Sequence, residues 1–182
     1  MIAAILKENI QGETRVAATP KTVKELIDNG LQLRVQSGAG ESSFHSDQAY
    51  KDAGGEITPD VSSTLSGANI VLKVSPLTLD EVDALDEGSI YVSLLQTTKE
   101  IDLVKRLTEK KVTGFSMHLI PRTTLAQSMD ALSSQANIAG YKSVLVGAAH
   151  LAVYMPLLMT AAGTIPPAKV LIIGAGVAGL QA

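Results

Sequence analysis

The chain has 182 residues, and its 15 lysine and arginine residues against 18 aspartate and glutamate residues give a formal net charge of -3. A slightly acidic chain offers no bulk electrostatic attraction to nucleic acid or to an anionic membrane surface. The absence of cysteine excludes a disulfide framework, cysteine-ligated zinc and a thiol nucleophile, and an aromatic content of 3% without tryptophan argues against a base-stacking surface. At this length we expect one domain, or one domain and a portion of another.

The first 120 residues alternate between short β-branched runs and helix-like stretches. We predict strands at residues 2–6, 31–35, 70–74, 90–94 and 112–115. We predict helices at residues 47–53, 62–66, 79–85 and 100–110, and a further helix that begins at Thr19-Pro20 and ends at Asn29-Gly30. Strands that alternate with helices at this spacing indicate an α/β fold with a parallel sheet and right-handed crossovers.

The pattern changes at Ile120-Pro121, where a polar segment begins. We predict a long helix from about Met129 to Thr160, with an interruption at Pro156 as the alternative, then a linker at 163–167 and a strand at 169–173. The expected architecture is a Rossmann-like N-terminal subdomain (residues 1–127), a connecting helix and linker (128–163) and the start of a second Rossmann dinucleotide-binding unit (164–182).

One long stretch carries no charge. Residues 143–168 contain no Asp, Glu, Lys or Arg, and 26 residues are enough to span a bilayer. His150, Tyr154 and Pro156 lie near the middle of the stretch, and a histidine and a proline are costly in lipid. We therefore predict a helix buried between two subdomains, with a membrane-associated segment as the alternative.

The strongest short motif is rich in glycine. The apolar run 170–173 leads directly into Gly174, Gly176 and Gly179, which have the spacing Gly-x-Gly-x-x-Gly. In a dinucleotide-binding unit the first glycine permits a tight turn, the second lets a pyrophosphate approach, and the third allows close helix–strand contact. The alternative is a glycine-rich turn of an unrelated fold. The acidic residue for the ribose, about 20 residues further on, would follow Ala182, so we expect the chain to be the N-terminal portion of a longer protein.

The polar segment at 121–134 is the second candidate site. It holds Arg122, Gln127, Asp130 and Ser133. A nicotinamide carboxamide needs both donors and acceptors from fixed side chains, and Gln, Asp and Ser can supply them. The alternative is an exposed loop followed by a helix that Ser128 caps.

Other residues that could bind a ligand are less specific. The loop 37–40, Ser-Gly-Ala-Gly, follows a strand but lacks a third glycine, so we predict a structural turn rather than a phosphate loop. Lys73 ends a buried strand and either reaches the rim of the sheet or faces a ligand cleft, near which Arg15 also lies. The three histidines have no metal-ligand spacing, so we expect no metal site.

Together these stretches resemble a known family. Residues 121–141 and 160–170, followed by the glycine motif, closely resemble the NAD(H)-binding component of proton-translocating NAD(P) transhydrogenase, described as its alpha subunit or domain I. The opening at 7–20, the loop at 37–40 and the strand end at 72–74 also resemble the related alanine dehydrogenases.

The resemblance implies direct hydride transfer between NAD(H) on this component and NADP(H) on a separate component, with a membrane component that couples transfer to proton movement. It implies that the nicotinamide is held by Arg122, Gln127, Asp130 and Ser133. It implies that the pyrophosphate is held by Gly174, Gly176, Val177 and Gly179. A homodimer at the cytoplasmic side of the inner or plasma membrane, peripheral and soluble when isolated, is also implied. Transfer between two nicotinamides needs no general acid or base.

Two alternatives remain. Alanine dehydrogenases hold a keto acid with an Arg and a Lys, matched here by Arg15 and Lys73, but their acid/base His falls near Gln96. Because glutamine cannot transfer the proton, we expect Arg15 and Lys73 to be fold or cleft residues. The other alternative is a non-catalytic fragment, and we expect the 182-residue chain alone to be inactive in hydride transfer.

Overall fold

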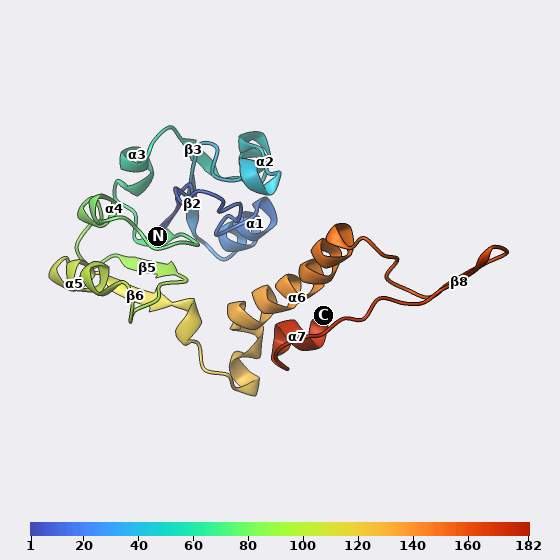
Figure 1. Cartoon of the computed structure of the whole chain (residues 1–182). Coiled ribbons are helices and arrows are strands. Elements are labelled where there is room, and N and C mark those ends of the chain that lie inside the picture. The colour runs from blue at the N-terminus through green and yellow to red at the C-terminus, as the bar shows by residue number, and fades with distance from the viewer. The chain divides into compact units, whose positions relative to one another are not determined.

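The computed structural model describes residues 1–182 and divides into two units (Figure 1). Unit 1 is Met1–Ile120 and unit 2 is Pro121–Ala182.

Unit 1 is built on one parallel sheet. Its strands are β1 (Ile2–Ile5), β2 (Gln32–Gln36), β3 (Glu56–Thr58), β4 (Ile70–Leu72), β5 (Ile90–Ser93) and β6 (Thr113–Ser116). The strand order is β3-β2-β1-β4-β5-β6, and every neighbouring pair is parallel. This order is that of a Rossmann sheet, so the predicted α/β class is confirmed. Strand β3 was not predicted because three residues are too few to show an alternating pattern.

Five α-helices connect these strands. They are α1 (Pro20–Asp28), α2 (Asp47–Asp52), α3 (Val61–Leu65), α4 (Leu79–Asp83) and α5 (Ile101–Glu109), with short 3-10 turns at Glu41–Ser43 and Met117–Leu119. The predicted limits of α1 are confirmed: Thr19 accepts a hydrogen bond from the amide of Thr22, and Gly30 follows the helix with φ of +88°. A side-chain oxygen at the N-cap satisfies an amide that the first turn leaves free.

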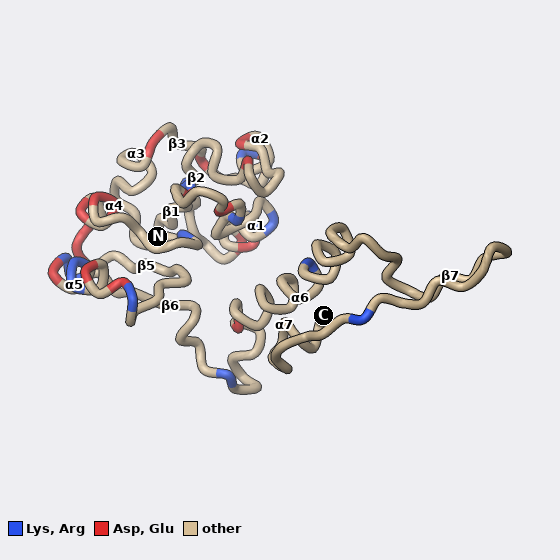
Figure 2. Tube along the Cα trace, in the orientation of Figure 1, with Lys and Arg blue, Asp and Glu red and all other residues tan.

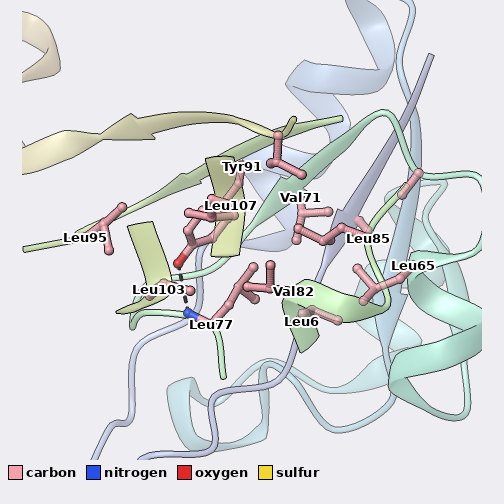
Figure 3. Packing of buried hydrophobic residues seen from close by; sticks show 13 residues of the cluster. Leu6, Leu65, Val71, Leu77, Val82, Leu85, Tyr91, Leu95, Leu103 and Leu107 are labelled. Carbon is pink, nitrogen blue, oxygen red and sulfur yellow. Dashed lines mark hydrogen bonds between the residues drawn. The ribbon is translucent and has the colours of Figure 1, made fainter. Parts of the chain in front are cut away.

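The sheet is covered on both faces. Alternate residues of β1 point to opposite sides, so Ala3 and Ile5 join a core with Val23 of α1 and Tyr50 of α2. Ala4 and the following Leu6 join the other core, which contains residues of α3, α4 and α5 (Figure 3). The central strands therefore read as continuous apolar runs, as expected for a sheet buried on both faces.

Unit 2 contains one long helix and little regular structure. Its elements are a 3-10 turn at Thr124–Met129, α6 (Ala131–His150), β7 (Leu158–Thr160), β8 (Gly163–Ile165) and α7 (Val177–Gln181), and β7 and β8 form an antiparallel hairpin. The prediction that the long helix reaches Thr160 is wrong. Helix α6 ends at His150, six residues before Pro156. Pro156 cannot donate a helical hydrogen bond and disfavours helical geometry at the preceding residue, so a helix could not have continued through it to Thr160.

Residues 169–173 are not a strand, contrary to prediction. The β-branched composition favours an extended chain, but a strand also needs a hydrogen-bonded neighbour. The two sheets of the structure contain no strand paired with this segment.

The uncharged stretch at 143–168 is also not one helix, since it includes the end of α6 and both strands of the hairpin. No helix of the structure is both long enough and apolar enough to cross a bilayer. The predicted burial of this stretch between two subdomains stays a prediction; within the structure Leu145 and Val146 of the stretch are exposed. Helix α6 packs on α7.

Candidate functional site

The polar segment of unit 2 forms a pocket. Its volume is about 310 Å³, and it is lined by Arg122, Thr123, Thr124, Gln127, Asp130 and Ser133. The four residues predicted to bind nicotinamide therefore line one cavity. Thr123 and Thr124 also line the pocket, but the sequence analysis did not predict this. Their hydroxyl groups next to Arg122 in a polar segment are the sequence feature that could have indicated it.

Backbone hydrogen bonds hold this segment in place. The amide of Thr123 donates to the carbonyl of Pro121 at 2.9 Å, and the amide of Ala126 donates to the carbonyl of Thr123 at 3.1 Å. Ala126 is buried, whereas its neighbours on both sides are exposed. The buried alanine fixes the turn, and the turn then directs Gln127 to the pocket.

Asp130 links the pocket to α6. Its Oδ1 accepts from the Ser133 amide at 2.9 Å, and its Oδ2 accepts from Ser133 Oγ at 2.5 Å. Asp130 is thus the N-cap of the helix, and the alternative in which Ser128 caps it is wrong. The hydrogen bonds from Ser133, with a smaller contribution from the Arg122 guanidinium, hold the pKa of the Asp130 carboxyl below its ordinary value. The carboxylate is therefore ionised at neutral pH and acts only as an acceptor.

This set of groups suits a neutral amide ligand. A carboxylate has about four lone-pair sites, and Ser133 uses two of those on Asp130. Gln127 carries both an amide donor and a carbonyl acceptor, and Arg122 supplies donors only. A carboxamide, with one acceptor and two donors, could bond to all three side chains.

The glycine motif has the conformations that its pattern predicts. Gly174 has φ of +112°, a region that side chains other than glycine rarely adopt. A Cβ on Gly179 would lie 2.0 Å from the carbonyl oxygen of Gly174, so only glycine fits there. A Cβ on Gly176 would meet nothing within 4 Å, and α7 begins at the next residue, Val177. The backbone at Gly176 is therefore open to an approaching group.

Close packing joins this motif to the long helix. A Cβ on Gly140 of α6 would lie 2.2 Å from the carbonyl oxygen of Ala178 in α7. Asn137 Nδ2 donates to Gln181 Oε1 at 2.9 Å in the same interface. Sequence reasoning missed Gly140, because a lone glycine in a helix has no partner visible in the sequence. An apolar cavity of about 740 Å³ lies beside this contact, lined by residues of α6, residues 169–172 and α7.

The two cationic residues of unit 1 that could bind a ligand, Lys73 and Arg15, are both paired with acidic side chains. Lys73 is buried, and its Nζ donates to Glu81 Oε1 at 2.9 Å, to Glu81 Oε2 at 2.8 Å and to Asn9 Oδ1 at 3.2 Å. An ammonium group has three donors, so none is left for a ligand. Arg15 donates to Glu13 through Nε at 2.8 Å and through Nη2 at 2.7 Å. Lys73 therefore pairs within the fold, and its predicted position at an exposed rim of the sheet is wrong because the residue is buried.

The loop at 37–40 is a structural turn, also as expected. Asp47 accepts from Ser37 Oγ at 2.6 Å and from the amide of Gly38 at 2.9 Å, which uses the donors that a phosphate would need. A Cβ on Gly40 would lie 2.6 Å from the Tyr50 ring. The glycine is thus required for packing.

Charge is distributed unevenly between the units. Most charged residues belong to unit 1, whereas unit 2 contains only Arg122, Asp130, Lys142 and Lys169 (Figure 2). No group of three or more His, Asp or Glu residues is arranged to hold a metal ion. The polar pocket therefore holds two of the four charges of its unit, Arg122 and Asp130.

The chain is similar to a family of known proteins over most of its length. The family described as "Alanine dehydrogenase/PNT, N-terminal domain" matches residues 4–139, and its C-terminal domain counterpart matches residues 143–182. The chain is 45% identical to the first of the separate parts of NAD(P) transhydrogenase subunit alpha from Rhodospirillum rubrum, over 100% of this chain and 49% of that protein. It is 30% identical to an alanine dehydrogenase of Methanococcus maripaludis, with the same coverage of 100% and 49%.

Solved structures give the same result. The crystal structure of a transhydrogenase from Sinorhizobium meliloti is similar with a TM-score of 0.94 and 38% identity, over 100% of this chain and 54% of that chain. An L-alanine dehydrogenase structure is similar with a TM-score of 0.85 and 25% identity, over 100% and 50%. The chain spans about half the length of these relatives.

Proposed function

The chain belongs to the alanine dehydrogenase/PNT family, and from this membership we propose that it is a portion of the NAD(H)-binding component of an NAD(P) transhydrogenase. The family consists of oxidoreductases that bind nicotinamide dinucleotides, and the more similar relatives carry the name transhydrogenase. The complete protein passes a hydride between NAD(H) and NADP(H).

One observation carries the proposal: Arg122, Gln127, Asp130 and Ser133 line a single pocket. The ionised Asp130 accepts from the carboxamide NH2 group of the nicotinamide, Gln127 pairs with the same carboxamide, and Arg122 donates to its oxygen. Ser133 orients Asp130 through two hydrogen bonds. The role of these residues is to hold the ring, because the reaction requires no proton transfer by the protein.

The glycine motif provides the second half of the proposed site. The amides at Gly176 and Val177 begin α7, and free amides at the start of a helix favour an anionic group. Gly174 and Gly179 allow the turn and the close contact that bring these amides together. We assign the pyrophosphate of NAD(H) to this loop.

The chemistry is a direct exchange. The C4–H bond of the dihydronicotinamide breaks, and its two electrons and proton move as one hydride to C4 of the oxidised nicotinamide of NADP. NADP is held by a separate component, and a membrane component couples the exchange to proton translocation. The NAD(H)-binding component acts as a homodimer, bound peripherally at the cytoplasmic side of the inner or plasma membrane. The names of the relatives, which are subunits or portions of subunits, support a multi-component protein.

Amino-acid dehydrogenase activity is less well supported. The donors of Lys73 are all used by Glu81 and Asn9, the guanidinium of Arg15 is paired with Glu13, and Gln96 cannot act as acid or base.

The test is an Arg122→Ala variant of the complete protein, assayed with its NADP-binding component. We expect loss of a charged hydrogen-bond donor to the bound nicotinamide to weaken NADH binding or slow hydride transfer to an NADP analogue by roughly tenfold or more. Lys142→Ala, which removes a cation of α6 outside the pocket, is the matched control and leaves both quantities unchanged. Equal activity of the two variants would refute the assignment of the pocket.

A further inference from the structure

One threonine of the polar pocket does not use its hydroxyl as similar threonines of this chain do. Thr123 precedes the 3-10 turn Thr124–Met129 with an extended backbone, and its side chain caps no amide of the turn. Thr19 and Thr78 precede α1 and α4, also with an extended backbone, and each hydroxyl accepts from the third amide of its helix. Thr123 therefore has the N-cap position and backbone of these two residues but not their hydrogen bond.

The hydrogen bonding of the 3-10 turn explains this difference. Its third amide, that of Ala126, donates to the backbone carbonyl of Thr123 at 3.1 Å, which is the short-range bond typical of a 3-10 turn. The amide that a capping hydroxyl would bond is therefore already used. The hydroxyl of Thr123 remains available as a donor and an acceptor, and Thr123 lines the pocket.

The chemistry of the ligand indicates which of its groups this hydroxyl would bind. Arg122 and Gln127 supply donors for the carboxamide oxygen, and Asp130 and Gln127 supply acceptors for the carboxamide NH2 group. The only other polar substituent of a nicotinamide ring in NAD(H) is the ribose joined to the ring nitrogen. We propose that Thr123 binds a hydroxyl of this ribose, so that the polar pocket selects the nicotinamide nucleoside rather than the ring alone. This inference rests on the proposed function and adds a specificity-determining residue to it.

The test measures NADH affinity in matched variants of the complete protein. Thr123→Val keeps the β-branched shape but removes the hydroxyl, and it should weaken NADH binding by about two- to tenfold, the range expected for one neutral hydrogen bond. Thr123→Ser keeps the hydroxyl and should bind NADH like the parent. Thr164→Val makes the same change in β8, outside the pocket, and should also bind NADH like the parent.

A second ligand identifies the sugar as the partner of Thr123. The probe is an NADH analogue whose nicotinamide-bearing ribose lacks the 2′- and 3′-hydroxyls, and the parent and Thr123→Val should bind it with equal affinity. Unchanged NADH affinity in Thr123→Val, or an equal loss of affinity for NADH and for the analogue, would overturn the assignment to the ribose while leaving the proposed function intact. A parent protein that does not bind NADH would overturn the proposed function itself.

Discussion

Asp130 combines a structural and a proposed functional role in one carboxylate. As the N-cap of α6 it accepts two hydrogen bonds from Ser133, and as a pocket residue it offers its remaining lone pairs to a ligand. The two roles can be separated because asparagine is as good an N-cap as aspartate but carries no charge and only one acceptor oxygen.

We predict that Asp130→Asn keeps the melting temperature of the complete protein close to that of the parent. Hydride transfer from NADH should fall by about ten- to more than hundredfold, because a charge-assisted bond to the nicotinamide is lost. Asp130→Ala removes the cap as well and should also lower the melting temperature. Thermal melts and hydride-transfer rates of the parent and both variants, measured side by side, separate the structural role of Asp130 from its proposed role in binding. A sharp drop in melting temperature for Asp130→Asn, with normal transfer by the folded fraction, would show that the residue is structural only.

The contacts of a single residue could be predicted where its partners lie close to it in the sequence. The polar set from Arg122 to Ser133 spans a dozen positions, so one turn brings it together. Lys73 was recognised as an unusual charge, but its partner Asn9 is 64 positions away. Only the sheet topology, which places the ends of β1 and β4 side by side, makes that contact visible.

At the scale of elements, the contact between α6 and α7 depends on one glycine. Alanine normally stabilises a helix interior relative to glycine by about 0.5–1 kcal/mol. At Gly140 the added Cβ would lie 2.2 Å from a backbone oxygen of α7, so the helices must move apart. At Gly147 of the same helix, nothing lies within 4 Å of the added atom.

We therefore predict that a glycine-to-alanine substitution has opposite effects on stability at Gly147 and at Gly140. Gly147→Ala should increase the free energy of unfolding by up to about 1 kcal/mol, whereas Gly140→Ala should decrease it by about 1–3 kcal/mol. Denaturant unfolding of the complete protein, followed by circular dichroism, measures both. If both variants gain stability equally, the close approach of α6 and α7 is incorrect.

Elements with explicit end signals were predicted well, and those without were not. Thr19-Pro20 and Asn29-Gly30 mark both ends of α1. From His150 to Thr160 the sequence is mostly apolar and rich in leucine and methionine, which is compatible with a helix, a strand or a loop. The hairpin of β7 and β8 is selected there by pairing across the turn at Ala161-Ala162, a contact that periodicity does not report.

At the scale of the whole molecule, two buried tyrosines predict how stability varies at high pH. Desolvation raises the pKa of Tyr91 to about 12, and it also raises the pKa of Tyr50 to about 12. In the unfolded chain a tyrosine has a pKa near 10. The folded state thus favours the neutral phenol, so this stability is fully present below about pH 10 and is lost as pH rises through about 12.

We expect the free energy of unfolding to fall by a few kcal/mol over this range, because each tyrosine contributes a slope of about 1.4 kcal/mol per pH between its unfolded and folded pKa values. Tyr91→Phe should make the fall shallower. The same variant should cost stability at neutral pH, because the amide of Leu77, which bonds Tyr91 Oη at 3.0 Å, loses its partner (Figure 3). Denaturant unfolding at intervals between about pH 8 and pH 12 tests both statements. If the free energy of unfolding falls with pH at the same slope in the parent and in Tyr91→Phe, Tyr91 does not cause the fall.

The α/β class was predictable because it follows from the repeated alternation of elements over 120 residues, which tolerates errors in any one of them. The order of strands within the sheet was not. Strand β1 lies between β2 and β4 at the centre, although it is first in the chain.

That central position has a consequence for folding during synthesis. When β1 leaves the ribosome, neither neighbour exists, and its second edge stays unpaired until Asn69 arrives, 67 positions later, to bond the amide of Ile2. The half-sheet of β1, β2 and β3 with α1 and α2 can assemble first, and the later strands then add in order from β4 outwards. Contacts this distant in sequence fold slowly, so the exposed edge of β1 is the portion of the nascent chain most in need of protection from other chains.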